Sequence, residues 1–541
     1  MIKSVGAFGL GTAISRIFGL GREVVLASLF GAGFAMDAFR VAFLIPNFLR
    51  DFFAEGTINA AFIPVFAETQ KSRGVNESRE SKSPRNRRVE TQDSIVTTDS
   101  ITEEGFQLVN WILNGLLVLV GGITLLGVLF SPLLVQGVAH GFSHVPEKIE
   151  LTIRMTRIMF PYLLFVTLIA VVMGVLNFAG RFFFPAFSPT FWNLTIILSG
   201  FLIAPWVDPP ILGIAIGVTL GGFFQLFSML PSLYKKGFRY RPSWNLSHPA
   251  VKKVLFLALP VALGFAATKI NLFVNILLAT FLEEGSVSYL SYAFRLMHLP
   301  LGIFGVAVAT VALPLLSREA AKDEMGKVRE TFSHSFRLVL FLSLPASIFL
   351  FVLATPLIRL LFERGSFSPI DTLNTSQALQ FYAIGIIGAA SAKVVANTFY
   401  SLKYPKTPLR ITWITVFANL LLCLILMRLL QFKGLALATS LAALLNLSLL
   451  LIGLRKKLKR IDGRRIFRTS SKVALSALLM GMGVYLFVQW FEARWITPSL
   501  ALQIVEIFFS LLLATSLFFL LAFWMKVEEV MIFLSSMKNA K

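Results

Sequence analysis

Residues 500–525, LALQIVEIFFSLLLATSLFFLLAFWM, form an apolar stretch that contains a single charged residue, Glu506. As one helix, such a stretch is long enough to cross the roughly 30 Å hydrocarbon core of a bilayer. Similar stretches recur along the chain of 541 residues, which is 56% hydrophobic and only 14% charged. Because soluble proteins carry about 25% charged residues, this composition excludes an ordinary soluble protein. The sequence predicts an all-α, polytopic membrane protein.

Apolar stretches separated by polar residues, glycine or proline predict about fourteen transmembrane helices. Their approximate cores are residues 5–30, 38–66, 105–131, 150–179, 186–205, 211–232, 254–281, 286–316, 336–361, 376–401, 408–429, 434–454, 470–490 and 500–525. The first, second and eighth stretches differ from most of the others because arginine lies well inside them.

The distribution of basic residues predicts the orientation of the chain. With the N-terminus inside the cell, the termini and the inner loops, with the helix ends next to them, hold 35 of the 50 Lys and Arg residues, and the interiors of the predicted helices hold nine. The outer loops, with the helix ends next to them, hold six, namely Lys148, Arg359, Arg364, Arg428, Lys433 and Arg494. Since basic loops stay cytoplasmic, we expect both termini in the cytoplasm. The net charge of +22 then indicates the cytoplasmic membrane face as a partner, and not a nucleic acid.

Two segments depart from the membrane pattern. Residues 70–104 are rich in Ser, Thr, Arg and Glu, so we expect a disordered inner loop, with a regulatory or docking role as the alternative. The tail, residues 526–541, is expected to form a short interfacial helix. The N-terminus lacks the pattern of a cleavable signal and is expected to remain in the mature chain.

Compact catalytic motifs are missing from the sequence, including the P-loop, H-E-x-x-H and G-x-S-x-G. The five histidines lack the spacing of metal ligands, so no metal site is assigned. The single cysteine, Cys423, lies in an apolar stretch and allows no internal disulfide. We therefore do not expect a primary ATP-driven pump, and no bound cofactor is assigned.

Arginines inside the predicted helices are the candidate functional residues. Each one costs about 2.5–3.5 kcal/mol near the centre of a spanning helix, so it needs a compensating role. The set comprises Arg16, Arg22, Arg40, Arg50 and Arg295. Glycines are expected to bend or break the first helix, and Pro46 to interrupt the second, so that arginines reach one cavity. A net positive pocket would bind an anion, because guanidinium matches phosphate oxygens in pairs.

The alternative is that these arginines pair with the few nearby carboxylates and pin helices together. Glu23, Asp37, Asp51 and Glu55 are the candidates, and Asp37 stands three residues before Arg40, where a local pair would form. Ala38-Phe39-Arg40 and Ala293-Phe294-Arg295, each followed by proline, form a faint repeat. If this repeat is not chance, the substrate site lies between two halves near the bilayer midplane.

Residues 14–68, ISRIFGLGREVVLASLFGAGFAMDAFRVAFLIPNFLRDFFAEGTINAAFIPVFAE, closely resemble the MurJ (MviN) family of lipid II flippases. Residues 285–319, GSVSYLSYAFRLMHLPLGIFGVAVATVALPLLSRE, and 399–410, FYSLKYPKTPLR, also match that family. The resemblance implies a fold of the multidrug/oligosaccharidyl-lipid/polysaccharide exporter superfamily. It places an N-lobe in residues 1–232, a C-lobe in 233–455, and two additional helices with a tail in 456–541.

The activity implied by the resemblance is movement of lipid II, the undecaprenyl-pyrophosphate-linked peptidoglycan precursor, from the inner to the outer leaflet of the bacterial cytoplasmic membrane. The resemblance thus implies a transporter that is not an enzyme and that serves cell wall biogenesis and cell shape. The substrate-binding residues carried over by motif are Arg16 (S-R), Arg22 (G-R-E), Arg50 (N-F-L-R), Arg295 (A-F-R-L-M) and Asp37 (M-D-A-F).

Expected partners are lipid II, membrane lipids and cell-wall synthesis enzymes. The driving force would be the membrane potential, a monovalent cation gradient or consumption of product outside. Polar residues in the seventh and eleventh helices, Asn271, Asn275 and Asn419, are candidates for the cation, without an assignment. Alternatives are an exporter of another polyprenyl-linked glycan or of a drug on the same fold, a membrane-embedded glycosyltransferase, and a scaffold.

Overall fold

The computed structural model describes residues 2–53, 61–70, 101–245, 247–495 and 499–531. Throughout these ranges the regular elements are helices, joined by short turns. This is the arrangement expected in lipid, where a helix satisfies its own backbone hydrogen bonds and no water is present to replace them. The predicted all-α class is confirmed.

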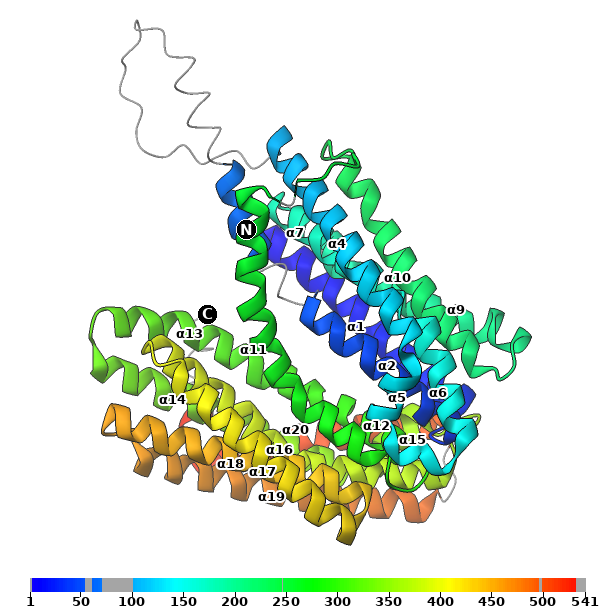
Figure 1. The fold of residues 1–541 in the computed structure, drawn as a ribbon. Helices are drawn as coiled ribbons and strands as arrows, with labels where there is room; N and C mark the ends of the chain where they lie inside the picture. The colour runs from blue at the N-terminus through cyan, green and yellow to red at the C-terminus, as the bar shows by residue number, and fades with distance from the viewer. Residues whose placement is uncertain (1, 54–60, 71–100, 246, 496–498, 532–541) are drawn as a thin grey trace, which may run out of the picture. The chain divides into compact units, whose positions relative to one another are not determined.

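The helices form two compact units. Unit 1 comprises residues 1–30 and 34–273. Its elements, coloured blue to green in Figure 1, are α1 (Ile2–Phe30), α2 (Phe34–Phe53), a helix at 61–70, α4 (Glu103–Leu129), α5 (Ser131–Val138), η1 (His140–His144), α6 (Pro146–Met159), α7 (Tyr162–Phe178), α8 (Phe183–Phe187), α9 (Pro189–Leu202), η2 (Ala204–Trp206), α10 (Ile211–Tyr234) and most of α11 (Pro249–Ala279). Within it, α1 packs on α8 and α9, and α2 packs on α6.

Unit 2 comprises residues 31–33 and 274–541. Its elements are the end of α11, α12 (Ser286–Pro300), η3 (Leu301–Val306), α13 (Ala307–Ala321), α14 (Met325–Val352), α15 (Ala354–Phe362), α16 (Pro369–Ser401), α17 (Lys406–Leu430), α18 (Phe432–Leu458), α19 (Gly463–Arg494) and α20 (Leu500–Trp524). The long helix α16 lies at its centre and packs against α12, α14 and α18. The expected lobe boundaries, between residues 232 and 233 and between residues 455 and 456, stay a prediction.

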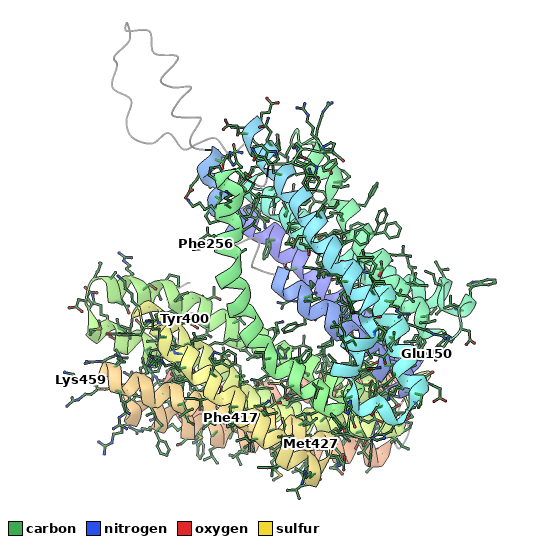
Figure 2. The ribbon with its side chains drawn as sticks, viewed as in Figure 1. Glu150, Phe256, Tyr400, Phe417, Met427 and Lys459 are labelled. Atoms are coloured by element: carbon green, nitrogen blue, oxygen red, sulfur yellow. The ribbon has the colours of Figure 1, made fainter. Side chains whose placement is uncertain are left out.

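Eleven helical stretches among the described residues are long and apolar enough to cross a membrane. Large apolar side chains are exposed on the helices, such as Phe256 of α11 at 78% and Phe417 of α17 at 62% (Figure 2). Exposed apolar surface on this scale is what a lipid environment covers. The helices α1, α2 and α11 each have 20 residues or more but are not among the eleven. The exact count of fourteen therefore stays a prediction.

The structure shows no break at two places where the sequence suggested one. The glycine-rich α1 is one continuous helix of 29 residues, so it is not broken at its glycines, and the alternative of a bend stays a prediction. The second helix continues through Pro46 to Phe53, because proline removes only one hydrogen bond and neighbouring helices can support the turn. Residues 71–100, most of the predicted inner loop, and residues 532–541 of the tail lie outside the described part of the chain.

Candidate functional site

Glu23 is the centre of a buried charge cluster in unit 1. Its carboxylate Oε1 accepts hydrogen bonds from Arg22 at 2.6 Å (Nη2) and 3.2 Å (Nε), and its Oε2 accepts one from Arg40 Nη2 at 2.5 Å. The carboxylate is fully buried and both guanidinium side chains are nearly so. One carboxylate on α1 therefore binds two arginines, one from α1 and one from α2.

An aromatic wall supports Arg22. Its guanidinium lies 4.5 Å from the ring centre of Trp192 on α9, where cation–π attraction operates. The Trp192 ring in turn contacts Phe43 of α2 and Tyr162 of α7. This environment excludes water from one face of the guanidinium and fixes its orientation. Arg22 thus has partners within the protein, as the alternative of structural pairing requires, and its part in binding a substrate stays a prediction.

Asp37 is part of a second buried ion pair. Its Oδ2 accepts a hydrogen bond from Lys148 Nζ of α6 at 3.0 Å, and both side chains are almost completely buried. The lysine also lies over the rings of Phe34 and Phe142. Asp37 and Arg40 therefore have partners on other helices, beyond the local pair that the sequence suggested.

Arg16 has a different environment from Arg22. It is exposed on α1 and forms no ion pair with a residue that the structure describes. Because α1 is continuous, six residues turn the helix through about 240° between Arg16 and Arg22. The two arginines consequently lie on different faces, and the bend expected to bring them together is not needed for the burial of Arg22. Arg50, near the end of α2, is half-buried.

Arg295 belongs to α12 in unit 2, and its side chain is half-buried. The preceding residue, Phe294, contacts the rings of His298 and Tyr382. The structure thus places three of the five predicted site residues on α1 and α2 with buried or half-buried side chains, Arg16 on α1 exposed, and Arg295 in the other unit. Whether all five act on one ligand stays a prediction.

A polar cluster lies inside unit 2. Asn275 of α11 donates to Thr439 Oγ1 at 2.7 Å, and its Oδ1 accepts from Asn419 Nδ2 at 3.2 Å and from Cys423 Sγ at 3.3 Å. Two of the three asparagines that the sequence marked are therefore in contact. No cluster of three or more His, Cys, Asp or Glu that could hold a metal ion was found among the described residues.

Sequence reasoning missed two members of the site. Lys148 was assigned to an outer loop because charged residues around Pro146 lower the hydropathy there, yet α6 begins at that proline and buries the lysine. Trp192 gave no signal because one tryptophan in an apolar stretch is ordinary. Glu23 was noted as a compensating acid, but its bridge to Arg40 joins two helices and cannot be read from the periodicity of either one.

Long apolar helices, exposed apolar surface and ion pairs buried between the helices define a polytopic membrane protein. The chain matches the family described as "Lipid II flippase MurJ" over residues 26–506. Since that match covers most of its length, the chain belongs to the MurJ family of lipid II flippases.

Curated relatives agree with this assignment. A probable lipid II flippase MurJ of Vibrio cholerae is 38% identical over 450 residues, covering 82% of this chain and 81% of the relative. One from Bdellovibrio bacteriovorus is 33% identical over 531 residues, covering 98% and 96%. The lipid II flippase MurJ of Burkholderia cenocepacia is 32% identical over 450 residues, covering 82% of each chain.

Solved structures agree as well. The inward closed conformation of a lipid II flippase MurJ superposes with a TM-score of 0.75 at 27% identity, covering 95% of this chain and 98% of that one. An inward-facing multidrug resistance MATE family transporter of the MOP superfamily gives a TM-score of 0.62 at 14% identity, covering 85% and 99%, which shows a shared fold alone. The family and fold predicted from residues 14–68 and their companions are confirmed.

Proposed function

We propose that this chain moves lipid II from the inner to the outer leaflet of a bacterial inner membrane. Membership of the MurJ family supports this activity directly. The transported group is a pyrophosphate-linked glycopeptide on a polyprenyl chain, so a protein that moves it must compensate two phosphate charges in a low-dielectric environment. Cationic side chains on the helices would supply that compensation, which is the prediction made for the five site residues.

The observation that carries the site assignment is the contrast between Arg16 and Arg22. Arg22 is bound to Glu23 and stacked on Trp192, whereas Arg16 is exposed on the same helix without an ion pair to any described residue. We assign Arg16 as the first contact of the pyrophosphate, with Arg50 and Arg295 as further cationic contacts. Arg22 and Asp37 then position the helices through the Glu23 cluster and the Lys148 pair.

The proposed mechanism is alternating access. The headgroup crosses within the protein while the polyprenyl tail stays in lipid along the two additional helices, α19 and α20. The driving force would be the membrane potential, a monovalent cation gradient or removal of product outside. Each charge moved through the potential contributes about 2.3 kcal/mol per 100 mV. Proteoliposomes with an imposed potential or a single cation gradient would separate these sources.

An assay of lipid II exposure tests both the substrate and the site. The native flippase of a bacterium is depleted, this chain is expressed, and an external hydrolase reports how much lipid II has reached the outer leaflet. Wild type should restore cleavage and Arg16→Ala should not. The matched control is Arg318→Ala, which removes an exposed arginine near the end of α13. If Arg16→Ala transports normally at equal expression, the binding role of Arg16 is excluded.

An exporter of another polyprenyl-linked glycan is the main alternative, because the same cations would bind its pyrophosphate. If wild type is folded in the membrane but fails to expose lipid II, this alternative becomes the better explanation. A drug exporter for cations is disfavoured by arginines on α1, α2 and α12, since a positive site repels such substrates.

The proposed orientation places both termini in the cytoplasm, as the positive-inside pattern predicts. Cys423 is buried, so a Cys423→Ser background allows introduced cysteines to be probed without interference. An introduced cysteine at Lys235 should react only with reagents that reach the cytoplasm, and one at Arg494 only from outside. Docking of cell-wall synthesis enzymes on the inner loops is a further proposal, which crosslinking from the same cysteines would test.

A further inference from the structure

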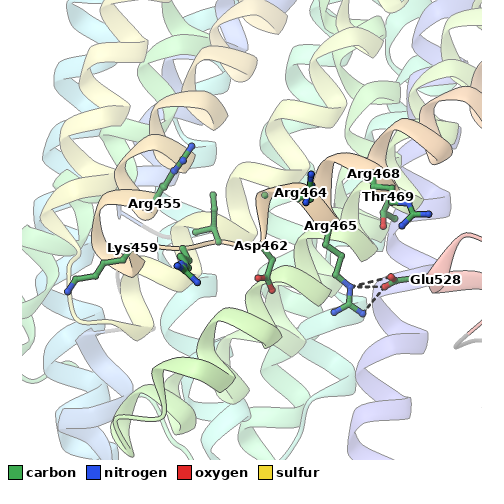
Figure 3. A pocket seen from close by; sticks show the side chains of 11 residues that line it. Arg455, Lys459, Asp462, Arg464, Arg465, Arg468, Thr469 and Glu528 are labelled. Atoms are coloured by element: carbon green, nitrogen blue, oxygen red, sulfur yellow. Dashed lines mark hydrogen bonds and ion pairs between the residues drawn. The ribbon is translucent and has the colours of Figure 1, made fainter.

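A cavity of about 970 Å³ lies where α18 ends and α19 begins (Figure 3). Its lining includes six cationic side chains and two carboxylates: Arg455, Lys459, Arg460, Arg464, Arg465 and Arg468, with Asp462 and Glu528. Two residues of the connection have left-handed backbone, Lys459 with φ 63° and Asp462 with φ 47°. This tight turn brings cations from the end of one helix and the first turns of the next to the same cavity.

Glu528 neutralises only one side of this basic cavity. Its carboxylate accepts hydrogen bonds from Arg465 Nη2 at 2.9 Å and Nε at 3.0 Å, and it also binds Arg337. The other five cations form no ion pair with a carboxylate in the part of the chain that the structure describes. Six cations against two carboxylates leave a formal excess of four positive charges, which favours a bound anion.

The cation types favour phosphate among anions. Five of the six are arginines, and a guanidinium binds two phosphate oxygens at once. Arg464 and Arg468 are one helical turn apart on α19, so both can face the same group. They also lie in the first turns of α19, where the helix dipole adds to the attraction for an anion.

An apolar stripe continues from these arginines along α19. Leu475, Leu479, Met482 and Leu486 are 48%, 47%, 59% and 61% exposed. They lie 7, 11, 14 and 18 residues after Arg468, separations that are close to whole turns of a helix, so all share its face. Since α19 is a candidate membrane span, its arginines stand at the end of a lipid-facing apolar surface. An anion joined to acyl chains fits both parts, whereas a free phosphate fits only the cavity.

We propose that the basic cavity at the α18–α19 junction binds the phosphate of an anionic phospholipid, whose acyl chains lie along the α19 stripe. Basic pockets at the membrane surface hold such headgroups through the same combination of charge and apolar contact. Glu528 binds Arg465, so this arginine is neutralised and the phosphate would bind to the other cations of the cavity. The inference goes beyond the proposed transport, because it concerns a lipid that is bound and not moved.

Binding to the purified full chain tests the proposal without a transport measurement. The chain is titrated in neutral detergent with phosphatidylglycerol, phosphatidylcholine, undecaprenyl pyrophosphate or inorganic phosphate, and bound lipid is counted by native mass spectrometry. We expect phosphatidylglycerol to bind and phosphatidylcholine and inorganic phosphate to bind much more weakly. The double variant Arg464→Gln/Arg468→Gln should weaken phosphatidylglycerol binding by about tenfold or more, since charge-assisted bonds are lost.

The matched control is Arg318→Gln/Lys322→Gln, which removes two exposed cations with the same spacing at the end of α13. It should bind phosphatidylglycerol like wild type. Should the double variant Arg464→Gln/Arg468→Gln not fold, the single variant Arg460→Gln, in the connection between α18 and α19, tests the same cavity. Unchanged affinity in the cavity variants overturns the proposal, as does equal binding of inorganic phosphate. Binding of undecaprenyl pyrophosphate without phosphatidylglycerol also overturns it and makes the cavity part of the substrate path.

Discussion

Lys148 donates a hydrogen bond to Asp37 at 3.0 Å, although 111 residues separate them in the sequence. Both side chains are nearly inaccessible, and two phenyl rings line the lysine. The pair joins α6 to α2 across an apolar interior, where neither charge would be stable alone. One member of the predicted binding set is thus already neutralised, which separates Asp37 from the arginines that would meet an anionic substrate.

Removing Lys148 alone should be more damaging than removing the pair. Lys148→Met removes the buried lysine that pairs with Asp37, and breaking a buried pair costs about 3–5 kcal/mol. The double variant Asp37→Asn/Lys148→Met should recover much of that loss, because the carboxylate is neutralised together with the lysine. Reversible unfolding in mixed micelles would measure both values. Equal losses in the single and double variants would show that the pair is not what stabilises this interface.

The Glu23 cluster predicts an unequal response of its members. Arg40→Met leaves Glu23 paired with Arg22, so the carboxylate keeps a buried cation and the loss should be small. Glu23→Gln instead removes the carboxylate that both guanidiniums bind, and should cost about 3–5 kcal/mol. Melting temperatures of the two variants at equal detergent concentration would rank them. The explanation fails if Arg40→Met is the more destabilising change.

The sequence predicts the membrane class and most helices because apolar stretches of about 20 residues have few other uses. Helices such as α17 (Lys406–Leu430) and α18 (Phe432–Leu458) contain their predicted cores, 408–429 and 434–454. What it cannot predict are contacts between helices. The sequence predicts Lys148 in a loop and a local pair between Arg40 and Asp37. The pattern of one helix shows which of its residues share a face, but not which residues of another helix they contact. The pairing with Glu23 depends on how α1 and α2 pack.

Glu528 gives the C-terminal segment a defined pH dependence. Its bond to Arg465 lowers the pKa of this carboxyl below the ordinary value of 4.5, and Arg337 adds to the effect. A lowered pKa in the folded state means that the bonds stabilise the protein fully above the ordinary pKa, and that this contribution is lost as pH falls through the lowered value.

Melting curves between neutral and acidic pH would measure this contribution. The difference between wild type and Glu528→Gln should be constant from pH 7 to about 5 and shrink below that. Glu330→Gln removes an exposed carboxylate of α14 that forms no ion pair with a described residue, and should show no such change. A difference that grows on acidification would contradict the assigned sign.

Close packing of α16 on α18 depends on glycine. A Cβ at Gly388 would lie 2.7 Å from the backbone carbon of Ala443, and one at Gly385 would lie 2.7 Å from the hydroxyl of Ser440. Backbone cannot move aside as a side chain can, so Gly388→Ala should cost about 1–3 kcal/mol. Gly326→Ala is the control, since nothing lies within 4 Å of its position. Similar melting temperatures for the Gly388 and Gly326 variants would rule out the close approach.

Two carboxylates near Arg359 should differ in how their neutralisation changes the stability of the protein. Glu492 Oε1 accepts a hydrogen bond from Arg359 Nη1 at 2.7 Å, whereas Glu506 is buried with its Oε1 unbonded to any described residue. Glu492→Gln weakens the ion pair and should cost about 1–3 kcal/mol. Glu506→Gln removes a buried carboxyl that lies near the negative Glu492, so the melting temperature should stay the same or rise. Because both changes replace a carboxylate with an amide of the same shape, a loss of stability on Glu506→Gln as large as that on Glu492→Gln would mean that Glu506 also serves as a partner of Arg359.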